Sequence, residues 1–261
     1  MNCLICNTSS HYFFTKQFNC FGLKNVDYYR CNHCGSVFAK TLLELAEEEW
    51  QTLCSEYHSS YRDSGNNPDD PNWLQRLNHQ GETLLSLTDL GILSKSEKWL
   101  DYGCGDGELG AFLEKAGIAV DCYDRYWKKP TYVHSSKLIP GSYPLVINTS
   151  LFEHLRDQST MDTIIELITH DGVFALHTLV RGDIPRDPNW FYLLPVHTLF
   201  FTNKAMKILF NKWGFSCSLY AVDARLWLWF RQPLAAMLKK HPELDKPNQW
   251  QISEGFMAYW P

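Results

Sequence analysis

An acidic residue and three alternating glycines lie close together in the segment LDYGCGDG, which runs from Leu100 to Gly107. Glycine is needed where a chain turns sharply after a strand and a ligand must lie against bare backbone. An acid at the carboxyl edge of that strand can accept a hydrogen bond from an amino group of the ligand. We therefore expect a binding turn formed by Asp101, Gly103, Cys104, Gly105 and Gly107.

Two kinds of cofactor use a turn of this type. Read from Gly105, the segment GDGELG fits the GxGxxG pattern of dinucleotide binding, in which a helix N-terminus faces a pyrophosphate. That register leaves Asp101 and Gly103 inside a buried strand, which costs stability. The register that begins at Gly103 avoids this cost. We therefore favour S-adenosylmethionine and keep a nicotinamide or flavin dinucleotide as the alternative.

A second acid has the spacing that this interpretation requires. The next expected strand contains VDCYD, and Asp124 ends it 21 residues after Gly103. A carboxylate at that edge can bind both hydroxyls of a ribose. Asp121 is the alternative, although it could simply face solvent. We expect Asp124 to hold the sugar of the cofactor.

Two pairs of cysteines have the spacing of a metal site. Cys3 and Cys6 form one CxxC pair, Cys31 and Cys34 form another, and 24 residues separate the pairs. Each pair makes a tight turn that points two thiolates at one place, and four thiolates complete a tetrahedral zinc site. Four thiolates leave no open position, so the expected role is structural. A segment of about 40 residues buries too little apolar surface to be stable without such a metal.

Other arrangements of these cysteines remain open. Disulfides are the main alternative, but gaps of two residues suit chelation better, and we expect a reducing compartment. Cys20 and His33 are possible substitute ligands. We favour zinc.

The hydrophobic pattern predicts the elements that must position these residues. Amphipathic helices are expected over residues 41–56 and 73–90, with a loop at 63–71 between them. From residue 98 onward, strands alternate with helices. The expected strands cover residues 99–102, 118–124, 132–138, 143–149, 172–180, 215–222 and 255–260. Three helices are expected in this part. The first follows the glycine turn and ends at residue 116, and the other two cover residues 157–168 and 202–213.

Regular alternation of strands and helices implies an α/β fold with helices on both faces of the sheet. We expect a Rossmann-like, mostly parallel sheet that is sandwiched by helices and preceded by a small zinc-ribbon module. The expected domains are the zinc ribbon at 1–40, a helical linker or cap at 41–95 and the Rossmann-like domain at 96–261.

Four segments together resemble class I S-adenosylmethionine-dependent methyltransferases. They are LDYGCGDG, VDCYD, YPLVINTSLFEHLRD and DGVFALHTL, and the resemblance covers about residues 97–222. Tyr102 departs from the pattern, because the family usually has an aliphatic residue there. The resemblance implies a methyltransferase that uses S-adenosylmethionine. It also implies that Asn148 binds the cofactor and that Glu153 and His154 border the acceptor pocket, although the latter two could instead cap and flank the next helix.

The N-terminal part resembles a zinc-bearing subgroup that methylates sugars, including nucleotide-sugar C-methyltransferases. The two CxxC pairs are followed there by an aromatic stretch, which here reads EYHSSY. In that subgroup, aromatic hydroxyls close over the cofactor or substrate. The resemblance therefore nominates Tyr57 and Tyr61, which could alternatively be packing residues.

Three histidines are candidates for a catalytic base. His197 lies in PVHTLFFT, which resembles a histidine-containing segment ahead of the penultimate helix of the family, with Thr202 as the expected N-cap. In sugar methyltransferases a histidine there can act as a base. His177, at the end of a strand, and His154 are the rivals. Each could instead have a structural role.

The acceptor is the least determined part of the function. A sugar-containing small molecule is favoured, because several aromatic residues near the expected site could stack on sugar rings. These residues are Trp190, Phe191, Tyr192, Trp227 and Trp229, which could equally belong to the core. An RNA methyltransferase that docks RNA through its zinc module is one alternative. A non-catalytic binding protein with the same fold is the other.

Composition limits the remaining possibilities. The 261 residues are 45% hydrophobic and 20% charged, which is typical of one globular core with a small appendage. The net charge of −5 gives no basic surplus for binding a phosphate backbone, so a nucleic acid partner is not expected. No apolar run reaches the length of about 18 residues that a membrane span needs, and the N-terminus lacks a signal-peptide pattern. We expect a cytoplasmic enzyme and make no prediction of its oligomeric state.

Overall fold

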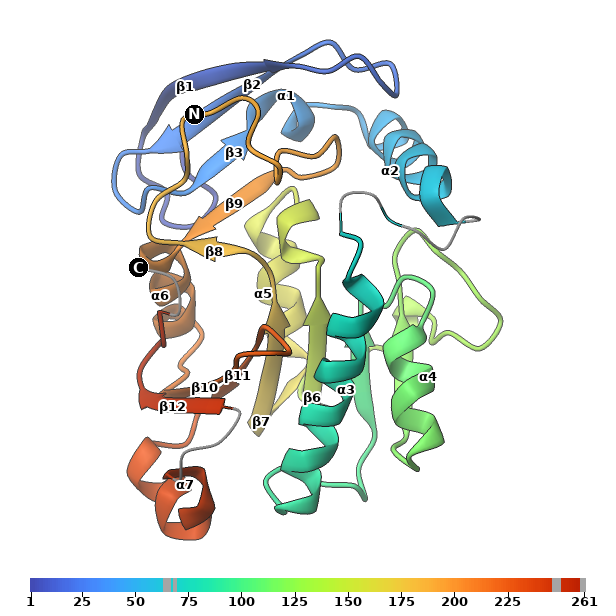
Figure 1. Cartoon of the computed structure of the whole chain (residues 1–261), viewed down its shortest axis with the longest axis vertical. Helices are drawn as coiled ribbons and strands as arrows, with labels where there is room; N and C mark the ends of the chain where they lie inside the picture. The colour runs from blue at the N-terminus through green and yellow to red at the C-terminus, as the bar shows by residue number, and fades with distance from the viewer. Residues whose placement is uncertain (63–66, 68–69, 246–249, 259–261) are drawn as a thin grey trace.

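A computed structural model describes residues 1–62, 67, 70–245 and 250–258 (Figure 1). Its larger sheet has seven strands in the order β12-β10-β11-β7-β6-β4-β5. These strands are β4 (Trp99–Tyr102), β5 (Val120–Tyr123), β6 (Tyr143–Thr149), β7 (Ile168–His177), β10 (Cys217–Ala221), β11 (Leu226–Phe230) and β12 (Trp250–Glu254). β5, β4, β6 and β7 pair in parallel with their neighbours in this order. β11 pairs antiparallel with β7, and β10 pairs antiparallel with both β11 and β12.

The expectation of a mostly parallel sheet was therefore wrong, because the sheet is mixed. The cause is β11, which the sequence did not reveal as a strand. Only four residues connect β10 to β11, so the two strands form a hairpin and must be antiparallel. β11 then pairs antiparallel with β7, with Trp229 opposite Phe174.

Helices cover both faces of this sheet, as predicted. α3 (Trp73–Asp89), α4 (Glu108–Lys115) and α7 (Leu234–Lys240) pack on one face, and α5 (Gln158–Glu166) and α6 (Asn203–Lys212) pack on the other. Alternation along β7 explains this arrangement, since Phe174 and Leu176 join one core cluster while Val173 and Ala175 join the other. A strand that is buried on both faces reads as a continuous apolar run.

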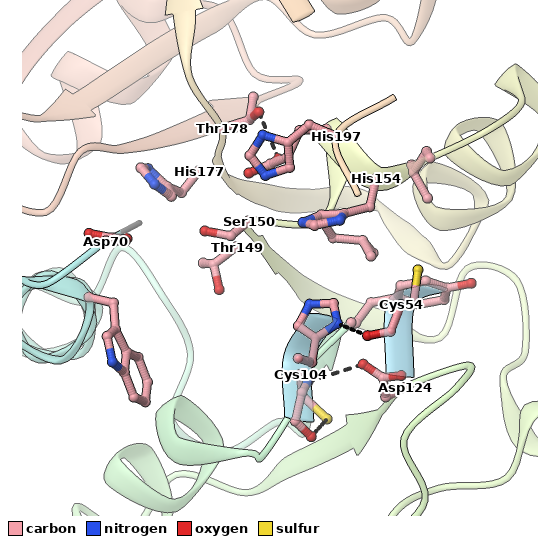
Figure 2. A pocket seen from close by; sticks show the side chains of 18 of the residues that line it. Cys54, Asp70, Cys104, Asp124, Thr149, Ser150, His154, His177, Thr178 and His197 are labelled. Carbon is pink, nitrogen blue, oxygen red and sulfur yellow. Dashed lines mark hydrogen bonds between the residues drawn. The ribbon is translucent and has the colours of Figure 1, made fainter. Parts of the chain in front are cut away.

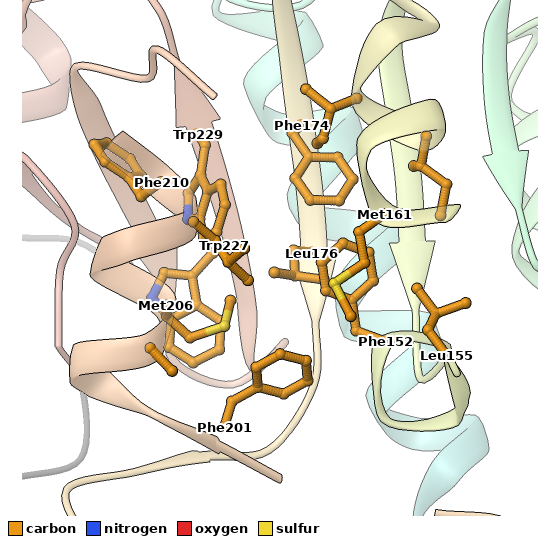
Figure 3. Close-up of a cluster of buried hydrophobic side chains, with 14 of the residues drawn as sticks. Phe152, Leu155, Met161, Phe174, Leu176, Phe201, Met206, Phe210, Trp227 and Trp229 are labelled. Carbon is orange, nitrogen blue, oxygen red and sulfur yellow. The ribbon is translucent and has the colours of Figure 1, made fainter. Parts of the chain in front are cut away.

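The core on the α5–α6 face is rich in aromatic rings (Figure 3). The ring centroid of Trp229 lies 5.7 Å from that of Phe174 and 5.2 Å from that of Phe210. Rings at these separations and steep angles pack with the favoured edge-to-face geometry. Trp229 is therefore a core residue and not a sugar-stacking one.

The smaller sheet joins distant parts of the chain. Its order is β1-β2-β3-β9-β8, with β1 (Ser10–Gln17), β2 (Asn25–Cys31), β3 (Val37–Ala39), β8 (Val180–Arg181) and β9 (Leu199–Thr202). Val37 pairs with Phe200, and Phe38 with Leu199, in an antiparallel ladder. Strands from the 1–40 segment and from residues 180–202 thus share one sheet, seen at the top of Figure 1.

The helix expected over residues 41–56 is interrupted. α1 (Lys40–Leu43) ends early, and α2 (Glu47–Arg62) begins after a break. The backbone N–H of Ala46 donates to the carboxylate of Glu49 at 2.9 Å, which is the reach-back of a capping interaction. Acidic residues favour a helix N-terminus, so the glutamate run starts a helix here.

Two expected strands differ from the structure. Residues 132–138 form no strand, and the short helix η1 (Ser135–Lys137) lies there instead, with the N–H of Ser136 capped by the His134 side chain. The last strand does lie beside residues 217–221, but it is β12 at 250–254 and not 255–260. Residues 259 and 260 of that prediction lie outside the described residues. The helix predicted at 73–90 is confirmed by α3.

No helix in the described ranges meets the combined length and hydropathy requirements of a membrane span.

The predicted N-cap of α6 also links this helix to the second CxxC turn. The Thr202 hydroxyl accepts from the N–H of Ala205 at 3.1 Å and donates to the carbonyl oxygen of Cys34. We predict that Thr202→Val lowers the free energy of unfolding by about 1 to 3 kcal/mol, because the N–H of Ala205 and the carbonyl of Cys34 both lose this hydroxyl as a partner.

Urea denaturation followed by circular dichroism measures this change. Thr163→Val is the matched control, because that hydroxyl bonds only to the carbonyl of Ser159 on an exposed helix surface, and its cost should stay within about 0.5 kcal/mol. Equal losses in the two variants would contradict the role of Thr202.

Candidate active site

A cavity of about 760 Å³ opens at the carboxyl ends of β4, β5, β6 and β7. The residues that follow each of these strands line it, as do side chains from α2 and α3. Ligands of open α/β sheets bind at this edge, where the strand order reverses. The cavity has two ends in Figure 2, with Cys104 and Asp124 at one end and His177, His197 and Thr178 at the other.

The glycine turn forms one wall of the cavity directly after β4. Gly103 has φ +79°, and a Cβ there would lie 2.5 Å from Cδ2 of Leu151, so only glycine fits. A Cβ at Gly105 would meet nothing within 4 Å, which leaves its backbone open to a ligand. Cys104 also lines the cavity, whereas Gly107 lies behind the turn at the start of α4.

Asp101 is the penultimate residue of β4 and lines the cavity with a buried carboxyl group. It is 2% exposed, and among the described residues its Oδ1 atom has no hydrogen-bond partner. Burial, and then the charge of Asp124, raise the pKa of this carboxyl to about 7. A buried acceptor at the cavity wall is chemically suited to an amino group of a ligand, and this contact of Asp101 stays a prediction.

Asp124 connects the ends of β5 and β4. Its Oδ2 accepts from the N–H of Gly105 at 3.1 Å, and its Oδ1 accepts from the N–H groups of Tyr126 and Trp127 at 2.9 and 2.8 Å. These bonds fix the carboxylate and leave lone pairs for further donors. Asp121, the alternative, does not line the cavity and bonds to the hydroxyl of Tyr143 at 2.9 Å.

The other predicted cofactor residues lie in different places. Asn148 is fully buried, does not line the cavity and donates from Nδ2 to the carbonyl of Tyr102 at 3.0 Å. It therefore ties β6 to β4 behind the cavity wall. Tyr57 lines the cavity from α2. The side chain of Tyr61 lies outside the described residues.

Glu153 occupies the other end of the cavity, on the short helix η2 (Phe152–His154). It is 2% exposed, and its two carboxylate oxygens accept from the hydroxyls of Tyr192 and Thr178, both at 2.8 Å. Burial raises the pKa of this carboxyl, and the two hydroxyls oppose that effect. Glu153 does not cap the next helix, because Asp157 caps α5 through the N–H of Thr160.

The three candidate histidines all line the same cavity. His197 is hydrogen-bonded through Nδ1 to the carbonyl of Tyr192 at 2.9 Å, and His177 through Nδ1 to that of Arg225 at 2.7 Å. A carbonyl only accepts, so Nδ1 carries the proton and Nε2 keeps a free lone pair in both rings. The ring centroid of His154 lies 4.9 Å from that of His197.

Burial keeps these imidazoles neutral. It lowers the pKa of His177 and of His197 to about 3. The pKa of His154 also falls well below its usual value, because of burial and then the neighbouring His197 and His58. The end of the cavity that holds Glu153 therefore has three uncharged nitrogen bases at neutral pH.

The aromatic candidates divide between cavity and core. Phe191, Tyr192 and Trp227 line the cavity. Trp190 and Trp229 are buried in hydrophobic clusters, which is the core alternative for both, and Trp227 is also almost fully buried in a core cluster.

Arg76 of α3 and His58 of α2 are among the cavity residues that sequence reasoning missed. Arg76 pairs with Asp70, and its Nη2 lies 3.5 Å from the hydroxyl of Ser150. Its buried Nε has no partner within the part of the chain that the structure describes. The sequence did hold a signal for Arg76, because polar residues lie on the otherwise apolar stripe of α3 that faces the sheet. Arg76 and the buried Gln80 are four residues apart and continue the stripe of Leu84.

The four paired cysteines converge as predicted. Their Sγ atoms lie within 4.8 Å of one another, with Cys3 to Cys34 at 3.6 Å and Cys6 to Cys31 at 3.5 Å. Thiolates on one tetrahedral zinc lie about 3.8 Å apart, so the cluster fits the metal, and all four cysteines are free. Cys20 and His33 are not part of this cluster.

Residues 73–219 match a family model described as a methyltransferase domain. The match spans more than half of the chain, so the chain belongs to this family. It is an S-adenosylmethionine-dependent methyltransferase. The matched region begins at α3, which places this helix with the catalytic fold.

Solved methyltransferase structures resemble the chain at low sequence identity, and no curated protein matches it. The 1,6-didemethyltoxoflavin-N1-methyltransferase of Burkholderia thailandensis is 15% identical, with a TM-score of 0.49 over 85% of this chain and 97% of that chain. Phosphoethanolamine N-methyltransferase 2 of Haemonchus contortus is 14% identical, with a TM-score of 0.43 over 82% and 54%. A methyltransferase of Archaeoglobus fulgidus is 16% identical, with a TM-score of 0.40 over 54% and 72%.

The buried carboxyl of Asp101 predicts a pH-dependent stability. Its pKa in the folded chain lies above the unfolded value of 3.8, so folding disfavours the ionised form. Stability of the cofactor-free protein should therefore fall between about pH 4 and pH 7. Asp101→Asn removes this cost, and its advantage over the wild type should grow across that window to about 4 kcal/mol.

Thermal or urea unfolding of both proteins at pH 5 and pH 8, without cofactor, measures this difference. An advantage of Asp101→Asn that is equal at the two pH values would contradict the shifted pKa.

Proposed function

We propose that this methyltransferase acts on a small molecule, a sugar or a sugar-containing compound, by C- or O-methylation. The observation that carries the proposal is one cavity that holds the glycine turn at one end and three neutral histidines at the other. Its volume of about 760 Å³ lies within the range of about 300 to 1,000 Å³ that is typical of small-molecule sites. A folded RNA needs a wider and more basic surface.

The cofactor end is assigned residue by residue. The Asp124 carboxylate accepts hydrogen bonds from the ribose hydroxyls, and the Asp101 carboxylate accepts one from the amino group of the cofactor. The backbone at Gly103, Cys104 and Gly105 lies along it. Tyr57 closes over the cofactor or acceptor, as the resemblance implies. Asn148 and Gly107 support this end from behind the wall.

S-adenosylmethionine, when bound, supplies an electrophilic methyl group at the sulfonium. The chain has to align the acceptor with that group, exclude water and remove a proton from the acceptor. The Nε2 lone pairs of His177 and His197 are free for this proton, and His154 is the third candidate. Glu153 acts through Tyr192 and Thr178, which it holds in place.

A sugar acceptor is supported by the wall chemistry of this end. Phe191 and Tyr192 supply aromatic rings to the wall, and Thr149, Ser150 and Thr178 offer neutral hydroxyls. Rings that contact a flat sugar face, together with uncharged hydrogen-bonding groups, suit a polyhydroxylated ring. The resemblance to the zinc-bearing sugar methyltransferases also supports a sugar acceptor. By that resemblance, we propose that Cys3, Cys6, Cys31 and Cys34 bind zinc. Its role is to hold the N-terminal strands in shape.

Transfer of a tritiated methyl group from S-adenosylmethionine tests the acceptor class. We expect incorporation into members of a panel of nucleotide-linked sugars and none into transfer or ribosomal RNA. Incorporation into RNA alone would contradict the proposal and favour the RNA alternative. Labelling of neither class, with cofactor binding intact, would contradict the sugar assignment.

The ribose assignment has its own test. Asp124→Ala should weaken S-adenosylmethionine binding by about tenfold to a hundredfold, because hydrogen bonds to a charged acceptor are lost. Titration calorimetry measures this change. Asp121→Ala is the matched control, since this acid ends outside the cavity and should leave the affinity unchanged. Equal affinities for Asp124→Ala and the wild type would refute the assignment.

A further inference from the structure

A second group of metal-ligating side chains lies at the acceptor end of the cavity. One carboxylate oxygen of Glu153 and one imidazole nitrogen each of His154 and His197 lie within 4.8 Å of one another. All three residues line the cavity, and Figure 2 draws the two histidines across it from Asp124. We infer that these three side chains bind a divalent transition-metal ion, and that the ion binds two adjacent oxygens of the acceptor.

The donor set suits such an ion. Two imidazoles and one carboxylate are a common ligand set for zinc and for other first-row divalent metals. Ligand atoms about 2.1 Å from one metal lie about 3.0 to 3.4 Å apart, so small side-chain movements would close the present spacing. Three protein ligands leave coordination positions open, and these face the cavity. The site therefore differs from the closed cluster of four cysteines.

The surrounding residues already orient two of the three ligands. The hydroxyl of Tyr192 donates to Glu153 at 2.8 Å, and its backbone carbonyl accepts from Nδ1 of His197 at 2.9 Å. The Thr178 hydroxyl donates to the other oxygen of Glu153 at 2.8 Å. Hydrogen bonds of this kind fix ring tautomers and carboxylates around metals. Nε2 of His197 is consequently left as the ligand atom.

Charge balance favours a cation at this place. Glu153 is 2% exposed, and among the described residues no lysine or arginine forms an ion pair with its carboxylate. The charge of Arg76, which pairs with Asp70, acts on it only from farther away. An isolated buried carboxylate is costly, whereas a carboxylate that coordinates a metal is compensated. The adjacent histidines are uncharged donors and suit the same ion.

The inference rests on the proposed function for its acceptor chemistry. A metal with two open positions binds two neighbouring oxygens, such as the vicinal hydroxyls or the hydroxyl and carbonyl of a sugar. The metal would occupy the lone pairs of His154 and His197. His177 is outside the group and remains free to accept a proton, with Nδ1 bonded to the carbonyl of Arg225.

Equilibrium dialysis with Co²⁺ tests the site. Purified protein is first shown by metal analysis to contain one zinc ion per chain. We expect one additional Co²⁺ per chain, without the sulfur-to-metal charge-transfer absorption that cobalt bound to the four cysteines would give. Glu153→Gln and His197→Ala should each weaken cobalt binding at least tenfold. His177→Ala is the matched cavity-histidine control and should bind cobalt like the wild type.

The outcomes are separable from those of the proposed function. Wild-type protein that binds no cobalt beyond the zinc site would overturn the inference, as would variants that bind it normally. Titration with S-adenosylmethionine on the same samples reports whether each variant is folded. The sugar assignment is judged by methyl transfer alone, so either conclusion can fail while the other stands.

Discussion

The arrangement of the cavity depends on the buried residue Glu153. Its carboxylate accepts hydroxyl bonds from Tyr192 and Thr178, and its backbone carbonyl accepts from the N–H and the hydroxyl of Thr198 at 2.7 and 3.1 Å. One residue thus joins the end of β6, the end of β7 and the segment that covers the acceptor end. Removing this carboxylate would leave the hydroxyls of Tyr192 and Thr178 without this partner, which costs more than the bonds themselves are worth.

Burial gives the two ends of the cavity opposite electrostatic character. At the cofactor end, two acids lie near each other, and the pKa of Asp101 is raised. At the acceptor end, the same physical effect lowers the pKa values of three histidines and keeps them neutral. In the proposed arrangement, the acids at one end attract the cationic cofactor, and the neutral imidazoles at the other end remain able to bind a metal ion. This separation needs no large surface charge.

Local sequence patterns predicted the parts that local rules determine. The glycine turn, Asp124 at the end of β5, helix α3 and the N-cap Thr202 follow from spacing and residue type. β11 was missed because LWLWF is buried on both faces and has no alternation to reveal it. Arg76 was missed because its role depends on a cavity that several elements build together. Pairing between β3 and β9 depends on tertiary structure and has no local signature.

The β3–β9 pairing also affects the order of events during synthesis. Val37 leaves the ribosome long before Phe200, its partner in the ladder. Until β9 emerges, the outer edge of β3 presents unpaired N–H and C=O groups to other nascent chains. Contacts between residues so distant in sequence also form slowly. A metal ion that binds the two CxxC turns early would keep this exposed edge in its final shape while translation continues.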